Sequence, residues 1–150
     1  MNHESYIKQC YLLAQEAKKN NEVPVGSLIL QNNKIIANSY NSSIKLNDPT
    51  AHAEINVIRE VCKKNNNYRI KNSILYSSLE PCLMCLIAAC EARIDLIVFG
   101  AYSSANKNIE DKFKYIKENF KIDHKLSFIG GILEKECSLI IKDFFKSRRS

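Results

Sequence analysis

The amino-acid sequence predicts an α/β fold, a three-layer α/β/α sandwich around a mixed sheet of five strands. Segments with helical hydrophobic periodicity alternate along the chain with short apolar runs typical of strands. Strands separated by helices require right-handed crossovers, which place helices on both faces of a sheet. The 150 residues, 45% of them hydrophobic and 25% charged, fit one globular domain and exclude a disordered chain.

The first third of the chain predicts a helix, a β-hairpin and a second helix. Residues 4–19 place apolar side chains on one face at helical spacing, and strand-like runs follow at 25–31 and 34–40. Asn32-Asn33 between these runs tolerates the positive φ of a tight hairpin turn. Asp48-Pro49-Thr50 then forms a turn before the second helix. The predicted inward residues of that helix are Ile55, Ile58, Val61 and Cys62.

The rest of the chain alternates three strands with three helices. The predicted strands cover 73–78, 96–100 and about 125–129. A helix opens at Glu80-Pro81, with the proline where a helix needs no N–H, and its apolar sides predict a central position. A lysine-rich helix at about 108–119 and a final amphipathic helix at about 133–149 complete the order. The predicted inward residues of the final helix are Leu133, Cys137, Ile140, Ile141 and Phe144.

The formal net charge is +6, and the last nine residues contribute +3 of it. A basic chain with a basic end favours a polyanionic partner, although a solvated, solubilising face would have the same composition. The first thirty residues hold no apolar export signal, and no uncharged run reaches the roughly 18 residues of a membrane span. The sequence therefore predicts a cytoplasmic protein without a membrane partner, whose six cysteines are thiols or metal ligands.

Two short motifs carry the strongest chemical signal, His52-Ala53-Glu54 and Pro81-Cys82-Leu83-Met84-Cys85. Each lies at a predicted helix N-terminus, where unpaired N–H groups and the helix dipole stabilise a thiolate. His52, Cys82 and Cys85 are ligand types that suit zinc, and three protein ligands leave a fourth position for water. Zinc lowers the pKa of such a water towards about 7. Glu54 can then move protons between that water and a substrate.

Other interpretations of the cysteine pair are weaker. A C-x-x-C pair alone could be a redox pair or half of a structural zinc site. A structural site lacks a second C-x-x-C or H-x-x-x-H to complete four ligands, and a redox pair leaves the His-x-Glu motif unexplained. The two motifs together therefore predict one catalytic zinc ion.

With these motifs the chain resembles the bacterial tRNA-specific adenosine deaminases of the zinc-dependent cytidine/deoxycytidylate deaminase superfamily. H-x-E…P-C-x-x-C is the general motif of zinc nucleobase deaminases. The blocks that carry the closer resemblance are 22–26, 47–55, 67–69, 79–85, 98–101, 131–133, 136–137, 143–145 and 148–149. The resemblance implies a cytidine deaminase-like fold and a single zinc-dependent deaminase domain over residues 1–150. It also implies hydrolytic deamination of adenosine to inosine at the wobble position of a tRNA anticodon loop.

Residue roles follow from the same resemblance. His52, Cys82 and Cys85 would bind one Zn²⁺ per subunit, and Glu54 would be the proton shuttle. Asn41 would hydrogen-bond the purine base, with the Ala53 N–H orienting the base and Val25 lining its pocket. The RNA contacts implied on the last helix are Lys142, Phe145, Lys146, Arg148 and Arg149. The family pattern further implies a homodimer in which the central helices contribute to the interface.

The end of the chain gains a sharper interpretation from this context. Lys142, Phe145, Lys146 and Arg149 recur at i, i+3, i+4 and i+7, which places cations around an aromatic ring on one outward stripe. Such a stripe can hold phosphates while the ring stacks on a base or ribose. The chain departs from the family at Tyr102-Ser103, where Arg-Asp is usual, at Ile87 in place of Gly, and at Glu91 in place of His. These departures concern substrate choice and helix packing rather than zinc.

Two other functions stay open at this point. A free nucleobase or nucleoside deaminase of guanine or cytosine type shares the zinc site but needs no basic tail. A catalytically silent RNA-binding or partner subunit needs no proton shuttle and would be free to lose Glu54.

Overall fold

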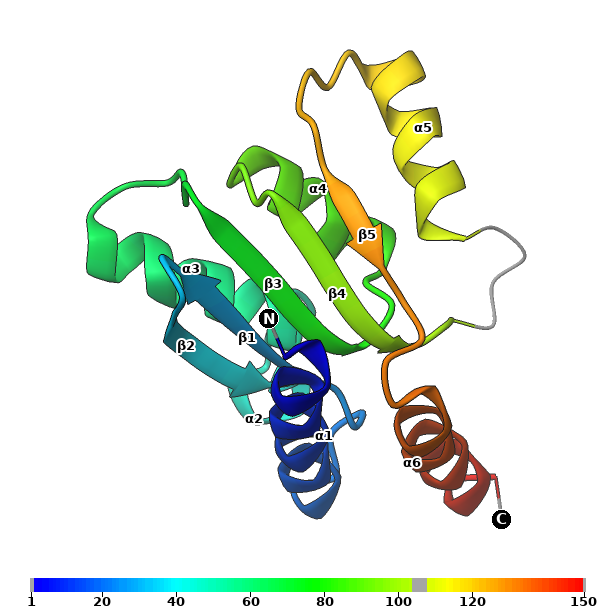
Figure 1. Cartoon of the computed structure of the whole chain (residues 1–150). Helices are drawn as coiled ribbons and strands as arrows, with labels where there is room; N and C mark the ends of the chain where they lie inside the picture. The colour runs from blue at the N-terminus through cyan, green and yellow to red at the C-terminus, as the bar shows by residue number, and fades with distance from the viewer. Residues whose placement is uncertain (1, 104–107, 150) are drawn as a thin grey trace.

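Five strands form one mixed sheet in the order β2-β1-β3-β4-β5 (Figure 1). The computed structural model describes residues 2–103 and 108–149. The strands are β1 (Gly26–Gln31), β2 (Lys34–Tyr40), β3 (Ser73–Leu79), β4 (Leu96–Ala101) and β5 (Ser127–Ile129). β1 pairs antiparallel with both β2 and β3, whereas the β3–β4 and β4–β5 pairs are parallel. The predicted mixed sheet of five strands is confirmed.

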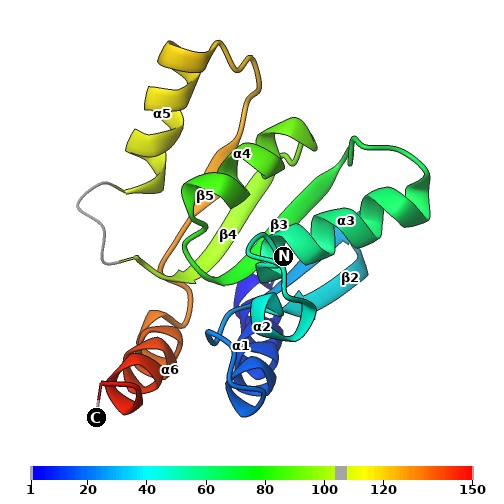
Figure 2. The ribbon, with the colours of Figure 1, turned by 180° about the vertical axis from the view of Figure 1, so that it is seen from behind.

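Helices cover both faces of this sheet (Figures 1 and 2). α1 (His3–Lys19) and α6 (Glu134–Ser147) lie on one face. α3 (Ala53–Asn65), α4 (Leu83–Glu91) and α5 (Ile109–Phe120) lie on the other, with α4 in the middle. The predicted three layers and the central position of α4 are therefore confirmed. No helix among the described residues is long and apolar enough to cross a membrane.

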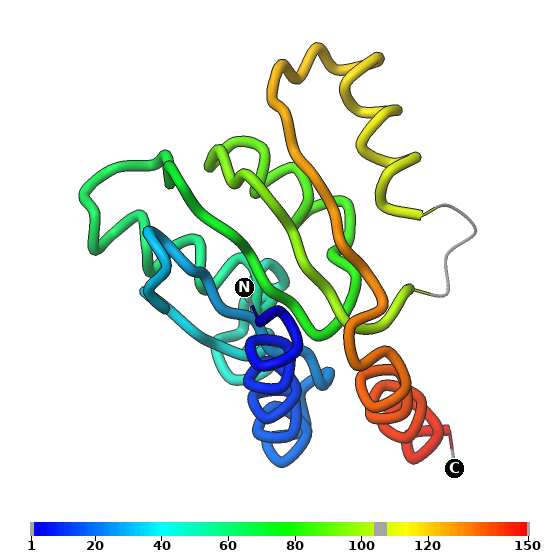
Figure 3. The backbone as a smooth tube through the Cα atoms, in the orientation of Figure 1, coloured from blue at the N-terminus to red at the C-terminus, as the bar shows by residue number. Residues whose placement is uncertain are grey.

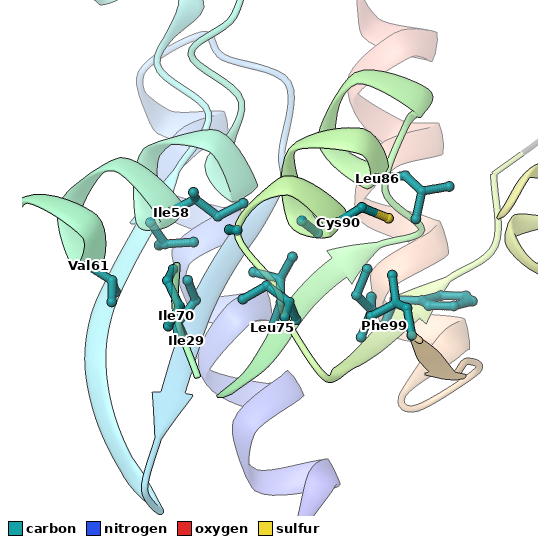
Figure 4. Packing of buried hydrophobic residues seen from close by; sticks show 14 of the residues in the cluster. Ile29, Ile58, Val61, Ile70, Leu75, Leu86, Cys90 and Phe99 are labelled. Carbon is teal, nitrogen blue, oxygen red and sulfur yellow. The ribbon is translucent and has the colours of Figure 1, made fainter. Parts of the chain in front are cut away.

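The larger part of the core lies between the sheet and α3 and α4 (Figure 4). Ile29 and Leu75 of the sheet are fully buried against side chains from the helices. Ile58 and Val61 of α3 and Leu86 and Cys90 of α4 complete this contact. Burying each such side chain contributes on the order of 1.5–3 kcal/mol, so the cluster fixes α3 and α4 side by side on the sheet.

The first and last helices of the described residues, α1 and α6, lie near each other in the trace of Figure 3. The Arg148 guanidinium just beyond α6 donates a hydrogen bond of 3.0 Å to the carbonyl of Asn21 just beyond α1. Cys137, Ile140 and Phe144 of α6 are buried as predicted, and the predicted inward residues Leu133 and Ile141 are half-buried.

The structure differs from the sequence prediction in three local features. A short helix α2 (Ser43–Leu46) follows β2 where none is predicted, and β5 is two residues shorter than expected. The prediction that the proline opens α4 is wrong, because Pro81 precedes the N-cap residue Cys82 and lies outside the helix. The Glu80 N–H still bonds to the Ala101 carbonyl in a strand-like manner, so the helix begins only at Leu83. The hairpin prediction is confirmed by φ angles of 53° and 65° at Asn32 and Asn33.

Candidate active site

Two helix N-termini meet at the candidate site. His52 is the N-cap residue of α3 and Cys82 is the N-cap residue of α4, and both have extended backbone angles. Cys85 lies one turn further into α4 and is fully buried. Because α3 and α4 pack side by side, their N-cap side chains approach each other across 30 residues of sequence.

The geometry of the three predicted ligands fits a zinc ion. His52 Nδ1 lies 3.6 Å from both Cys82 Sγ and Cys85 Sγ, and the two sulfurs are 3.7 Å apart. Tetrahedral zinc with its usual bonds would separate two sulfurs by about 3.8 Å and a sulfur and a nitrogen by about 3.5 Å. Among the described residues, this is the one group of three metal-ligating side chains drawn together in this way. The predicted ligand set is therefore brought together with zinc-like spacing.

The protonation state of Cys82 also suits a metal. Hydrogen bonding with the Cys85 thiol, assisted by the His52 ring, lowers the pKa of Cys82 to about 4 in spite of partial burial. The shared hydrogen bond and burial raise the pKa of Cys85 well above its usual range. Cys82 thus presents a thiolate at neutral pH, and the thiolate is the form that binds zinc.

Glu54 lies in the first turn of α3 and lines a pocket beside this cluster. Its side chain is only 4% exposed, and Oε1 has no hydrogen-bond partner in the part of the chain that the structure describes. Burial raises the pKa of Glu54 to about 7, with a further contribution from Cys82. A carboxyl group with a pKa near 7 can both accept and release a proton at neutral pH.

The pocket has a volume of ≈ 420 Å³, and its wall includes two of the three predicted substrate-binding residues. Val25 and Asn41 line it together with His52, Glu54 and Cys82. The Asn41 Oδ1 atom accepts a hydrogen bond of 2.7 Å from the Ala53 N–H. Asn41 therefore occupies the Ala53 N–H that is predicted to orient the base. The N–H₂ group of Asn41 takes no part in this bond.

Five further residues line this pocket and are not among the predicted site residues. They are Val23, Leu79, Glu80, Ser103 and Lys112. The Glu80 carboxylate accepts hydrogen bonds from the Ser103 N–H (3.2 Å), the Ser103 hydroxyl (2.8 Å) and the Ile109 N–H (3.0 Å). Two of these five residues carried a sequence signal: Glu80 stands directly before Pro81-Cys82, and Ser103 belongs to the Tyr102-Ser103 departure from the family.

A second hollow, a groove of about 680 Å³, adjoins the catalytic pocket. Four residues of the predicted stripe line it, Lys142, Phe145, Lys146 and Arg149, together with Tyr102, which follows β4. Leu79 and Ser103 line both the groove and the pocket, so the two hollows are contiguous. We call this second hollow the basic groove.

Arg148 lies apart from the basic groove. Its guanidinium carbon is 4.3 Å from the centroid of the Phe144 ring, and its Nη2 donates to the Asn21 carbonyl. The structure therefore does not place Arg148 with the other four predicted RNA contacts, because its position is one residue, or about 100° of helix rotation, away from the stripe.

A His-Cys-Cys cluster with zinc-like spacing, beside a buried carboxylate on an α/β/α fold, defines the class of zinc-dependent hydrolytic deaminases. The family described as cytidine and deoxycytidylate deaminase zinc-binding region matches residues 1–101. The chain belongs to this family and, within it, to the tRNA-specific adenosine deaminases. It is 42% identical over 149 residues to the tRNA-specific adenosine deaminase of Buchnera aphidicola subsp. Baizongia pistaciae, covering 97% of this chain and 90% of that protein.

Two solved structures are informative neighbours. One comes from work on A-to-I editing by tRNA:A34 deaminases at the wobble position of transfer RNA. It has a TM-score of 0.82 and 32% identity, over 91% of this chain and 98% of that chain. The other is a guanine deaminase from Bacillus subtilis with a TM-score of 0.64 and 40% identity, over 68% of this chain and 66% of that chain. The cytidine deaminase-like fold is therefore confirmed.

Proposed function

We propose that this chain converts adenosine to inosine at the wobble position of a tRNA anticodon loop, and that residues 1–150 act as one zinc-dependent deaminase domain. The observation that carries the proposal is the contiguity of the two hollows. The pocket that holds Glu54 and the zinc-ligand cluster opens beside a groove lined by three cations and two aromatic rings. The relatives and the solved A34 deaminase that the chain resembles over more than nine-tenths of its length support the same substrate.

His52, Cys82 and Cys85 would hold the zinc ion, one per subunit. Zinc bound there supplies a Lewis acid that lowers the pKa of a water to about 7 and so provides the nucleophile. Glu54 accepts a proton from this water and passes it to ring N1 of the adenine as oxygen adds to C6. Glu54 would then take the second proton from the hydroxyl added at C6 and deliver it to the amino group, which leaves as ammonia, so that the base becomes hypoxanthine.

Asn41 and Val25 would position the base directly, and the Ala53 N–H would act through the bond that holds Asn41. With Oδ1 bonded to the Ala53 N–H, the Asn41 side chain is held in one orientation and keeps its N–H₂ group as a donor for a purine nitrogen. Val25 is 4% exposed and contributes an apolar surface for the ring. A pocket of ≈ 420 Å³ accepts a single extruded nucleotide rather than a base pair, and a loop nucleotide costs least to extrude.

The basic groove favours an RNA substrate over a free base. A free guanine or cytosine carries no phosphate and would leave Lys142, Lys146 and Arg149 without a function, whereas a polynucleotide follows such a groove through its backbone. The alternative of a guanine-type deaminase draws on the Bacillus subtilis structure, but that similarity covers about two thirds of each chain. The alternative of a silent subunit conflicts with the retention of Glu54, which is costly to bury.

The same proposal includes a homodimer and a cytoplasmic location. Within one chain the outward side of α4 is uncovered, with Leu83 49% exposed and Met84 and Ile87 half-buried. An apolar helix side of this kind suits contact with a second copy. A cytoplasmic location accords with a tRNA substrate and remains a prediction.

The function is tested with the purified zinc-loaded protein and an unmodified tRNA that has adenosine at the wobble position. We expect inosine at that position, and ammonia released in equal amount. Free guanine, adenosine and cytosine, assayed in parallel, should react far more slowly. Deamination confined to the free bases would contradict the proposal, and RNA binding without deamination would support the silent subunit instead.

Replacing Asn41 with aspartate should lower kcat/KM for the tRNA by about 10- to 100-fold, because a buried donor to the base is lost. The variant keeps an acceptor for the Ala53 N–H, so fold and zinc content should match the wild type. Steady-state kinetics and metal analysis make the measurement. Asn41→Ala, which also removes the bond to Ala53, serves as the comparison and should melt at a lower temperature. Wild-type kinetics in Asn41→Asp would remove the residue from base recognition.

Replacing Lys142, Lys146 and Arg149 together with glutamine should weaken tRNA binding and lower the slope of log affinity against log salt by about 2 to 3. The reason is that each cation neutralises one phosphate. The matched control replaces three exposed lysines far from the groove in sequence, Lys34, Lys63 and Lys71, with glutamine. Binding titrations at several salt concentrations test this. Equal slopes in the two triple variants would show that the basic groove does not contact RNA.

A further inference from the structure

We infer that Lys112 binds a backbone phosphate next to the reacting adenosine, and that the buried Glu80 carboxylate holds the start of α5 so that Lys112 stays at the pocket. This inference rests on the proposed function, because the tRNA substrate is what would bring a phosphate to this place. It adds a contact inside the catalytic pocket to the cations of the basic groove.

Lys112 is the one lysine or arginine among the described residues that lines the pocket. It is half-buried on α5 and lines the same pocket as Glu54 and Cys82. The groove cations Lys142, Lys146 and Arg149 do not line this pocket. Among residues 2–103 and 108–149, no ion pair involves Lys112. A lysine at the wall of a substrate pocket, without an ion-pair partner of its own, is suited to pair with an anion that arrives with the substrate.

The charge balance of the pocket makes such a cation useful. Glu54 and Glu80 both line the pocket and are each less than 5% exposed. An extruded nucleotide brings the phosphates on its 5′ and 3′ sides towards the pocket mouth, where buried carboxylates would oppose them. Lys112 offsets this repulsion at the place where the backbone must pass. A free base carries no phosphate and gains nothing from the contact.

Glu80 fixes the elements on either side of residues 104–107. Its carboxylate accepts bonds from the N–H and hydroxyl of Ser103 and from the N–H of Ile109, the first residue of α5. Ile109 is also fully buried in the core beside α4. Lys112 follows Ile109 by three residues, which is nearly one helical turn. The bond at Ile109 therefore sets where the first turn of α5, and with it Lys112, meets the pocket.

Lys114 provides a matched control on the same helix. It is exposed and does not line the pocket or the basic groove. Both lysines are replaced by glutamine, one at a time, in a Glu54→Gln background, so that the bound RNA is not converted. The probe is an anticodon stem-loop with adenosine at the wobble position, and its affinity is measured by fluorescence anisotropy over a range of salt concentrations.

We expect Lys112→Gln to weaken binding roughly 5- to 20-fold and to lower the salt slope by about 1, with zinc content unchanged. Lys114→Gln should match the parent. A stem-loop with a neutral methylphosphonate at the phosphate 5′ or 3′ of the target adenosine identifies the partner. One of the two methylphosphonates should weaken the binding of the stem-loop to the parent protein. The same methylphosphonate should cause little further loss of affinity in Lys112→Gln. Additive losses at both positions, or equal salt slopes in the two lysine variants, would overturn the inference.

Glu80→Gln tests the positioning role. It keeps the shape of the side chain but replaces the carboxylate that accepts three hydrogen bonds. If Glu80 acts through Lys112, removing Lys112 in this variant should cost much less than in the parent, while zinc content stays the same. A full additional loss would assign Glu80 a purely structural role. Failure of the wild-type protein to form inosine would refute the proposed function separately, because the binding series involves no turnover.

Discussion

Replacing Glu54 with glutamine should lower kcat for wobble deamination by about 10²- to 10⁴-fold. This is the range that a positioned general acid–base group contributes. Glutamine has the same shape but neither accepts nor releases the proton that must reach N1. The three zinc ligands are untouched, so the variant should retain one zinc ion per chain and bind the anticodon stem-loop as tightly as the wild type. Single-turnover kinetics, metal analysis and RNA binding measure the three quantities independently.

The same variant should melt at or above the wild-type temperature. Glu54 is 4% exposed, and its Oε1 atom has no hydrogen-bond partner within the described part of the chain. A buried, unsatisfied polar atom costs about 1–3 kcal/mol, and a neutral amide avoids the larger cost of burying a charge. A variant that loses activity together with zinc or fold would assign Glu54 a structural role. Wild-type activity in Glu54→Gln would refute the proton shuttle.

The order of elements was predictable because most of them are long enough to show a period. Helices of twelve or more residues and the apolar runs of the hairpin strands carry their pattern locally. α2 has only four residues and no buried side chain, so it leaves no hydrophobic pattern to detect. At Pro81 the rule that proline favours the first helical position gave way to the backbone bond between Glu80 and Ala101, which no local pattern reveals.

The candidate site divides in the same way. His52 and Glu54 lie in one motif and Cys82 and Cys85 in another, so spacing within each motif was sufficient to select them. Glu80, Ser103 and Lys112 come together from separate elements of the fold, and their meeting depends on tertiary contacts. The hydrogen bond between Asn41 and the Ala53 N–H also appears only in three dimensions. It links two residues that the family resemblance implied to contact the base separately.

The two helices at the site begin with residues that place zinc ligands but do not stabilise the helix N-termini. Serine, threonine, aspartate or asparagine at an N-cap commonly contributes about 0.5–2 kcal/mol through a side-chain bond to the helix. The N-cap residues of α3 and α4 are His52 and Cys82, and neither side chain makes such a bond. Both side chains meet Cys85 instead. Binding of zinc can compensate for the missing caps, because it joins the two helix ends directly.

This arrangement predicts the effect of replacing a zinc ligand. Cys85→Ser should lose zinc, all deaminase activity and the stabilisation that zinc gives the fold. A serine hydroxyl is a harder ligand that stays protonated at neutral pH, and only two suitable ligands would remain. The loss of zinc affinity should exceed the 10- to 100-fold that follows loss of an outer-shell partner. Metal content after dialysis and thermal melting with and without a chelator provide the measurement.

Cys62→Ser is the matched control, because Cys62 is a half-buried thiol on α3 that does not belong to the group of zinc ligands. We expect it to keep one zinc ion per chain and near-wild-type activity, and to melt at a lower temperature when the chelator is added. Cys85→Ser should melt at the same temperature with and without the chelator, since it has no zinc to lose. One zinc ion per chain and wild-type turnover in Cys85→Ser would show that Cys85 is not a ligand, and the remaining pair of His52 and Cys82 could not then account for the site.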